Sequence, residues 1–336
     1  MSLNKRLIHI DMMIGIAMIL VVLGHLSIGD EPEWYRHGLH NWIYTFHMRL
    51  FVFLSAFLIR YTYKDVHSLK NYGSYLWKKF KKFFLPFLFV GIAVILFTTS
   101  DITFSKFESL VLTFLRCPRC SEASFLWYIY LLFGFYIISP ILFSLPQLAR
   151  VILCIASMFL PMLSAGNDFC AFDYTQYTFF YFLGILCAEW IEDIRQLKSW
   201  TWVVLSVPFL VFSVWVFTEG VEIGFEFPQL EWWLLPVGVA SLPLFYLLAQ
   251  LFAKISWINK PLTLISRNCY WIYLLQMFVI WGCEKLFRII FAEPPFPYAI
   301  FMVVTTLLAL AIPIALVEFF SSITDKKSRA THEPPR

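Results

Sequence analysis

The chain has 336 residues, of which 60% are apolar and only 14% charged, with a formal net charge of +4 and a mean hydropathy of +0.72. A soluble domain is about 45–50% apolar and about 25% charged. The composition therefore excludes an ordinary soluble domain, a disordered chain and a nucleic-acid-binding protein. Apolar runs of about 20 residues, the length that crosses a bilayer, occur from end to end. We therefore expect an all-α, polytopic membrane protein.

Ten apolar segments are expected to cross the membrane. They lie near residues 10–27, 42–60, 83–99, 124–143, 149–165, 175–190, 200–218, 231–252, 268–287 and 298–320. These spans leave no room for a large soluble domain. We expect one transmembrane domain over residues 1–323, followed by a disordered cytoplasmic tail over residues 324–336.

The basic residues predict the orientation of the spans. An even number of spans puts both termini on one side, and Lys and Arg are enriched in cytoplasmic segments. With a cytoplasmic N-terminus, 19 of the 26 Lys and Arg residues fall in cytoplasmic segments and six in segments outside. Both termini are therefore expected in the cytoplasm.

A Cys-Pro-Arg-Cys sequence at residues 117–120 falls in the loop that follows the third span, on the outside. Such spacing is typical of a redox pair, half of a zinc site or a disulfide. No second such pair and no nearby His pair completes a zinc site, so no metal is expected. A disulfide between Cys117 and Cys120, formed in an oxidising compartment, is favoured. Cys170 in the next outside loop is an alternative partner, and unpaired thiols or a catalytic redox pair remain open.

Ionisable side chains inside spans are costly and are candidates for function. Asp11 lies near the cytoplasmic end of the first span, and His25 follows 14 residues later, which is about 21 Å along a helix. His47 and Arg49 come early in the second span, which runs inward, so their depth is similar to that of His25. They predict either one polar site in the outer leaflet or a buried network with a packing role only.

A basic cluster, Lys78-Lys79-Phe80-Lys81-Lys82, ends the cytoplasmic loop after the second span. One interpretation is an anchor beside anionic lipid headgroups. The other is an anion-binding site for a phosphorylated cofactor. Lys78, Lys79 and Lys82 would share a face if the segment is helical.

Three stretches resemble the membrane-bound acyltransferase 3 family, which includes bacterial O-acetyltransferases of cell-envelope polysaccharides. The first runs from Ile10 to Ala17 and from Val21 to His25, and the second is Phe46 to Phe57, where the family reads roughly FHMPLFFFLSGF. The third is Lys79-Phe80-Lys81-Lys82 ahead of Pro86. Weaker matches follow in chain order at residues 126–128, 182–184 and 270–275.

Several residues depart from the family pattern. The first-span motif pairs a basic residue with a His eleven positions later, and His25 matches that His, but the basic position is Ile14. Arg49 replaces a Pro and Ala56 a Gly, while Gln276 stands where many members have His.

The resemblance implies an enzyme of the cell's inner membrane. It would transfer an acetyl or other short acyl group from acetyl-CoA or another short acyl-CoA, bound from the cytoplasm, to a carbohydrate or lipid-linked glycan. His25 would be the general base or would carry a covalent acyl group. For that reaction we expect His47 or Arg49 to be the oxyanion donor and Asp11 to be a further catalytic candidate. Lys78, Lys79 and Lys82 are expected to hold the CoA phosphates as point charges.

Two alternatives remain open from the sequence. Ten spans with polar residues at their centre are also typical of a transporter or flippase for a glycan or lipid. The missing basic residue at Ile14 is compatible with a homologue that has lost activity.

Overall fold

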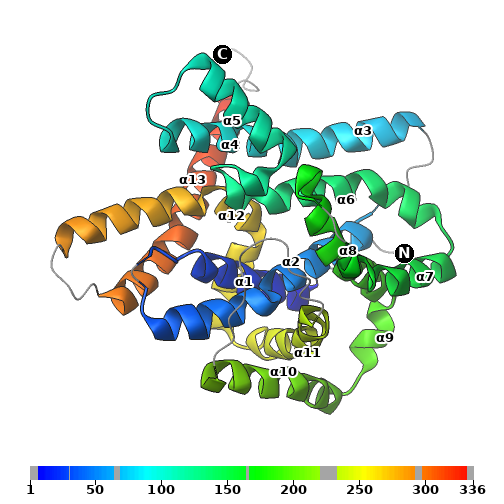
Figure 1. The fold of residues 1–336 in the computed structure, drawn as a ribbon. Helices are drawn as coiled ribbons and strands as arrows, with labels where there is room; N and C mark the ends of the chain where they lie inside the picture. Colours follow the sequence, from blue (N-terminus) through cyan, green and yellow to red (C-terminus); the bar gives the residue numbers. More distant parts are fainter. Residues whose placement is uncertain are drawn as a thin grey trace. The chain divides into compact units, whose positions relative to one another are not determined.

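The computed structural model describes residues 7–29, 31–63, 69–163, 166–219, 233–291 and 297–330 (Figure 1). These residues form helices and no strand, which confirms the all-α class. The α-helices are α1 Ile8–Gly24, α2 Asn41–Tyr61, α3 Leu69–Lys79, α4 Leu85–Thr98, α5 Phe104–Arg116, α6 Trp127–Ser144, α7 Gln147–Ser157, α8 Ala171–Glu189, α9 Ile191–Gln196, α10 Ser199–Glu219, α11 Leu234–Phe252, α12 Ser256–Ile290 and α13 Tyr298–Ala330. Two π-helical turns, Trp34–His40 and Phe80–Phe84, precede α2 and α4 without a break.

Six helical segments among the described residues are long and apolar enough to cross a membrane. They are Trp34–Tyr61, Asn71–Thr98, Ser124–Ser144, Ser199–Glu219, Leu234–Phe252 and Tyr298–Ser322. Each overlaps one expected span, and the other four expected spans fall on α1, α7, α8 and α12. The total of ten and the cytoplasmic termini stay predictions. The expected tail, 324–336, begins within α13, and residues 331–336 lie outside the described residues.

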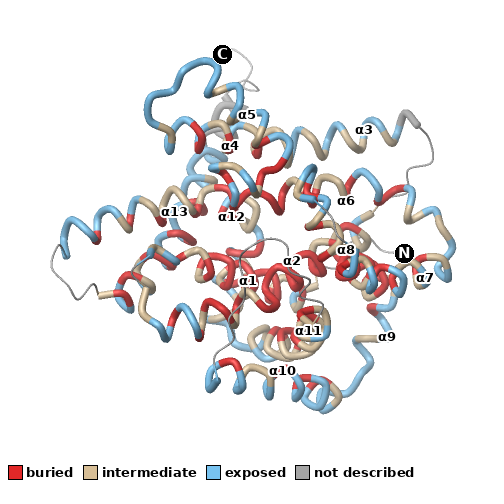
Figure 2. Tube along the Cα trace, in the orientation of Figure 1, coloured by how far each residue is buried: buried red, intermediate tan, exposed pale blue. Residues whose placement is uncertain are grey.

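The chain forms two compact units. Of the described residues, the first unit holds those within 48–211 and 233–244, and the second holds those within 7–47, 212–219, 245–291 and 297–330. In the second unit, α1 packs against α12 and α13, which also pack against each other. A Cβ at Gly15 would lie 2.6 Å from the carbonyl oxygen of Leu262. Glycine therefore allows the backbones of α1 and α12 to approach closely, and Figure 2 shows α1 largely buried.

A buried ion-pair network ties three helices of the first unit together. Oε1 of Glu189, at the end of α8, accepts from Nε of Arg60 at 2.7 Å and from Nη2 of Arg150 at 2.8 Å. Glu189 and Arg150 keep only 9% and 8% of their side chains exposed. Removing one partner of a buried pair strands the other charge away from water, so this network holds α2, α7 and α8 in one arrangement. From the sequence, Arg60 and Arg150 are simply two of the 19 Lys and Arg residues expected in cytoplasmic segments, with no partner indicated.

The segment expected as an outside loop contains structure of its own. Thr103 accepts a hydrogen bond from the backbone N–H of Lys106 and so caps the start of α5. Cys117 and Cys120 are joined by a disulfide, as the sequence favoured, and Cys170 is a buried free thiol. Arg119, inside the small disulfide loop, forms an ion pair with the buried Asp173 of α8.

Candidate active site

His25 is the residue at which α1 ends. Its backbone no longer continues the helix, and its ring turns toward α12, where Nε2 of Gln276 lies 3.1 Å from Nδ1 of His25. Gln276 is completely buried, and its other amide atom, Oε1, has no hydrogen-bond partner. The amide of Gln276 can face either way at such a position. Either Nε2 of Gln276 donates to an unprotonated Nδ1 of His25, or Oε1 of Gln276 accepts from Nδ1–H of His25. The second arrangement leaves Nε2 of the imidazole as the basic nitrogen.

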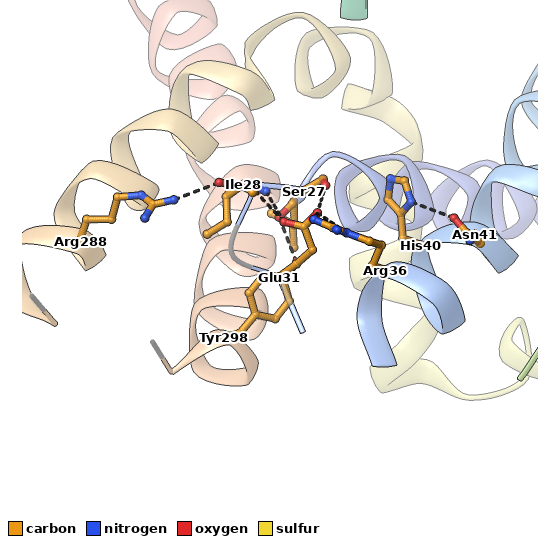
Figure 3. Close-up of polar contacts among 10 residues, drawn as sticks. Ser27, Ile28, Glu31, Arg36, His40, Asn41, Arg288 and Tyr298 are labelled. Atoms are coloured by element: carbon orange, nitrogen blue, oxygen red, sulfur yellow. Dashed lines mark hydrogen bonds and ion pairs between the residues drawn. The ribbon is translucent and has the colours of Figure 1, made fainter. Parts of the chain in front are cut away.

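Side chains from other elements donate hydrogen bonds to the backbone carbonyl groups around His25, and Figure 3 shows one of them, from Arg288 to Ile28. Carbonyls at a helix end lack partners within the helix and must find them elsewhere. Tyr35 Oη donates to the carbonyl of Leu23 at 2.5 Å, and Tyr44 Oη donates to that of Gly24 at 3.2 Å. Tyr298 Oη donates to the carbonyl of Leu26 at 3.0 Å, and Arg288 Nη2 donates to that of Ile28 at 2.9 Å. The donors come from the π-helical turn before α2, from α2 itself, from α13 and from α12.

Glu31 closes the turn that follows His25. Its carboxylate accepts from the backbone N–H groups of Ile28 at 3.1 Å and Gly29 at 2.6 Å, and from the hydroxyl of Ser27 at 2.6 Å. The guanidinium of Arg36 lies 3.1 Å away. Burial opposes ionisation of Glu31, but these hydrogen bonds outweigh it and lower the pKa to about 2. The carboxylate is therefore charged at neutral pH, and it fixes the backbone within a few residues of His25.

Two more histidines, His40 and His47, pack against the ring of Tyr44 in the second unit. The Tyr44 ring lies 4.3 Å from the ring of His40 and 4.7 Å from that of His47, between centroids. Nδ1 of His47 lies 2.8 Å from the carbonyl oxygen of Ile43, so Nδ1 carries a proton and donates it. Tyr44 thus contacts both His47 and the carbonyl of Gly24, the residue before His25. The grouping of His25 with His47 in one catalytic site stays a prediction. The sequence did not single out His40, because this residue lies just before the expected second span.

Arg49 has its contacts in the first unit. Its guanidinium lies 5.8 Å from the ring centroid of Tyr177, and its side chain is buried against Gly238 of α11. Tyr177 in turn packs on Trp127, with the guanidinium of Arg119 on that indole at 3.9 Å. Residues two apart on a helix do not face each other. Arg49 therefore leaves α2 in a different direction from His47.

Asp11 lies near the start of α1, almost the whole helix away from His25. One carboxylate oxygen accepts from the hydroxyl of Ser266 in α12 at 3.3 Å. The structure therefore separates these two candidates along the first helix, as the sequence spacing predicted.

The three lysines of the predicted phosphate site differ in their surroundings. Lys79 is half-buried, with its ammonium 4.3 Å from the ring centroid of Tyr136 and 5.5 Å from that of Tyr75. Lys78 and Lys82 are exposed. Exposed ammonium groups can meet a phosphate directly, whereas the charge of Lys79 faces aromatic rings. Nowhere in the described ranges do three or more His, Cys, Asp or Glu residues gather so that they could hold a metal ion.

These observations define a polytopic helical membrane protein with a polar, histidine-centred site at the end of its first helix. The sequence model of a family described as an acyltransferase domain matches residues 7–316, nearly the whole chain. The chain belongs to this family, acyltransferase 3, as the resemblance implied. Comparison with the curated proteins and with the solved structures gives no match.

Proposed function

We propose that the protein transfers an acetyl or other short acyl group from an acyl-CoA to a hydroxyl group of a cell-envelope carbohydrate. The contact that carries the proposal is the one between His25 and the buried Gln276. When Oε1 of Gln276 accepts from Nδ1–H of His25, Nε2 of the imidazole is left as the basic nitrogen, which is what a general base requires. The family match supports acyl transfer as the reaction.

The reaction balances with His25 as the proton carrier. Nε2 of His25 takes the proton of the sugar hydroxyl as its oxygen attacks the thioester carbonyl. The new C–O bond forms, the C–S bond breaks, and the imidazolium returns the proton to the CoA thiolate. An acyl-His25 intermediate is the covalent variant of the same transfer. His47 or Arg49 would donate to the oxyanion that forms in either case, and a contribution from Asp11 stays a prediction.

The donor is proposed to bind from the cytoplasm through Lys78, Lys79 and Lys82. Ammonium groups bind phosphate as point charges, and two of the three are exposed. The acceptor would then approach His25 from outside, across the inner membrane. Reporter fusions after residue 70 should read cytoplasmic, and fusions near residue 115 should read external. The reverse pattern would exchange the donor and acceptor faces and contradict this arrangement.

Replacement of His25 tests the proposal directly. His25→Ala and His25→Gln should each lower acyl transfer by about 10²–10⁴-fold, the usual contribution of a general base. The measurement is incorporation of labelled acyl groups from acyl-CoA into glycan by purified protein in vesicles. His37→Ala is the matched control, because His37 is an exposed histidine of the same unit, and it should retain activity.

Two results would overturn the proposal. The first is transfer by His25→Ala within a few-fold of the unmodified protein. The second is movement of glycan across the vesicle membrane by the unmodified protein with no acyl incorporation, which would indicate a transporter.

A further inference from the structure

We propose that Tyr298 and Glu31 are positioning residues for His25, which hold its backbone in place without touching either substrate. The proposal rests on the proposed function of His25 and adds two residues that neither the sequence motifs nor the family match assigns. Both residues act on the backbone that follows His25, and Figure 3 shows Glu31 and Tyr298 beside Ser27 and Ile28 of that segment.

The end of α1 is unusual in how its carbonyls are satisfied. Many helices end with a glycine in a left-handed conformation, which lets the chain turn and satisfies the last carbonyls locally. Here the terminal residue is His25 itself, with φ −91° and ψ 5°. The backbone N–H of Leu26 still donates to the carbonyl of Leu23. In addition, the carbonyls of residues 23, 24, 26 and 28 each accept from a side chain of another element. The position of His25 is therefore set by tertiary contacts and not by the helix alone.

Tyr298 supplies the contact closest to His25 on its C-terminal side. Its hydroxyl donates to the carbonyl of Leu26, and both residues are buried, with 4% of Tyr298 and none of Leu26 exposed. The ring of Tyr298 packs on the ring of Tyr35, with centroids 5.0 Å apart. Tyr35 donates to the carbonyl of Leu23. The two tyrosines, whose rings are tilted against each other, thus hold the backbone two residues before His25 and one residue after it.

Glu31 holds the next part of the same segment. Only 3% of its side chain is exposed, and it accepts from Ser27, Ile28 and Gly29. Gly29 has φ +92°, in the region that side chains disfavour. A carboxylate with several donors in one turn prevents that turn from relaxing. Residues 26 to 29 are therefore fixed from both ends, by Tyr298 and by Glu31.

Fixed geometry matters more for a base than for most groups. A displacement of about 1 Å at a reacting atom can cost about 100-fold in rate. A residue that only stabilises the fold would lower the amount of active protein. A positioning residue should lower kcat, with the KM values of donor and acceptor unchanged, because substrate binding is untouched.

The first experiment removes one hydroxyl group. Tyr298→Phe should lower kcat about five- to tenfold, the loss expected from one hydrogen bond, with both KM values unchanged. Glu31→Gln, a second variant of equal size, should also lower kcat. Tyr174→Phe is the matched control, because the Tyr174 hydroxyl also donates to a backbone carbonyl, that of Leu131 at 3.2 Å in the first unit. Its kcat should not change.

The second experiment reads the position of His25 without using activity. Diethyl pyrocarbonate modifies accessible imidazoles, and peptide mass spectrometry gives the rate at each histidine. In Tyr298→Phe and Glu31→Gln, His25 should react faster, while the exposed His37 serves as an internal reference. In Tyr174→Phe both rates should match those of the unmodified protein.

The results separate this proposal from the proposed function. An inactive His25→Ala together with slower Tyr298→Phe and faster modification of His25 supports both. Suppose that His25→Ala is inactive, but that Tyr298→Phe and Glu31→Gln both keep a normal kcat or both show normal modification of His25. This result overturns only the positioning roles. Full activity of His25→Ala overturns the proposed function, and the positioning roles with it.

Discussion

The segment around His25 and the basic segment at residues 78–82 are held in opposite ways. Around His25, hydrogen bonds of defined direction fix carbonyls, amides and the imidazole itself. In the basic segment, the lysines are exposed or lie over rings, as Lys81 does over Trp77 at 5.5 Å and Lys82 over Phe83 at 5.1 Å. Contacts of a cation with a ring face tolerate movement, whereas hydrogen bonds weaken steeply when bent.

The difference matches the two chemical tasks that we propose for these segments. A base must present one nitrogen to one hydroxyl, so orientation decides the rate. Lysines that neutralise phosphates act as point charges and can follow a moving ligand. We therefore expect single substitutions to have large effects near His25 and small, cumulative effects among the lysines.

After His25 itself, the largest effect is expected at Gln276, because its hydrogen bond to the imidazole is the only one that the described contacts include. Gln276→Leu keeps the volume but removes the amide, which leaves Nδ1 of His25 buried without its partner. A buried polar group left unpaired costs about 1–3 kcal/mol, so kcat should fall about 10- to 100-fold. The measurement is single-turnover transfer of a labelled acyl group. Gln276→His, which restores a polar partner, should recover part of the loss, and an unchanged kcat in Gln276→Leu would remove the amide from the site.

A second prediction concerns the packing that brings α1 to α12. Gly15→Ala places a methyl 2.6 Å from the carbonyl oxygen of Leu262, so the helices must separate. We expect a loss of about 1–3 kcal/mol in the free energy of unfolding, with lower kcat because Gln276 moves away from His25. Thermal unfolding in detergent and acyl transfer are both measured.

Gly282→Ala is the control for this prediction. It lies on the same helix α12, and nothing lies within 4 Å of the added methyl. Replacing a helical glycine by alanine in open space should stabilise by about 0.5–1 kcal/mol. Equal effects of the two substitutions would show that the close approach of α1 and α12 is unimportant.

The third prediction tests the basic segment. Exposed ion pairs contribute about 0.2–1 kcal/mol each, so Lys78→Ala and Lys82→Ala should each raise the KM for acyl-CoA at most about fivefold, with kcat unchanged. The double variant should show the product of the two effects. Lys81→Ala, also exposed, is the control and should leave the donor KM unchanged. If the double variant binds the donor normally, the lysines serve only as a lipid anchor.

The smallest effect is expected from acid. Because the pKa of Glu31 is lowered to about 2 in the folded protein, its stabilising contribution is complete above the unfolded value near 4.5 and is lost as pH falls toward 2. The stability difference between the unmodified protein and Glu31→Gln should therefore be constant above about pH 5 and shrink below it. Denaturation in detergent at each pH gives this difference. A difference that stays constant down to pH 2 would contradict the lowered pKa.

Hydropathy and motif position indicated the apolar helices and singled out His25 as a candidate, but they did not indicate which residues His25 contacts. His25 stood out because an ionisable group inside an apolar run is rare. Gln276 was visible only as a departure from a family pattern, since nothing local reveals that it meets a residue 251 positions away. Tyr35, Tyr44 and Tyr298 act on backbone carbonyls, which carry no sequence signal.

Helix starts were predicted less well where charged residues precede an apolar run. The second span was expected from residue 42, but the helix begins earlier because the π-helical turn Trp34–His40 joins α2. The segment with α5 was expected to be a loop, because an amphipathic helix lacks a continuous apolar run. The pairing of Arg60 and Arg150 with Glu189 was hidden for a different reason: the positive-inside rule counts charges but does not pair them.

The π-helical turn Phe80–Phe84 has a consequence for comparing this chain with its relatives. A straight α-helix turns about 100° per residue, so deleting one residue from this turn would restore regular geometry and rotate α3 about its axis relative to α4. Lys79 would then point away from Tyr136, and another side chain would take its place against that ring. Two relatives that differ by a single residue here would share one hydropathy profile and yet present different lysines at the surface of this segment. An alignment gap of one position in this segment is therefore a structural difference in its own right.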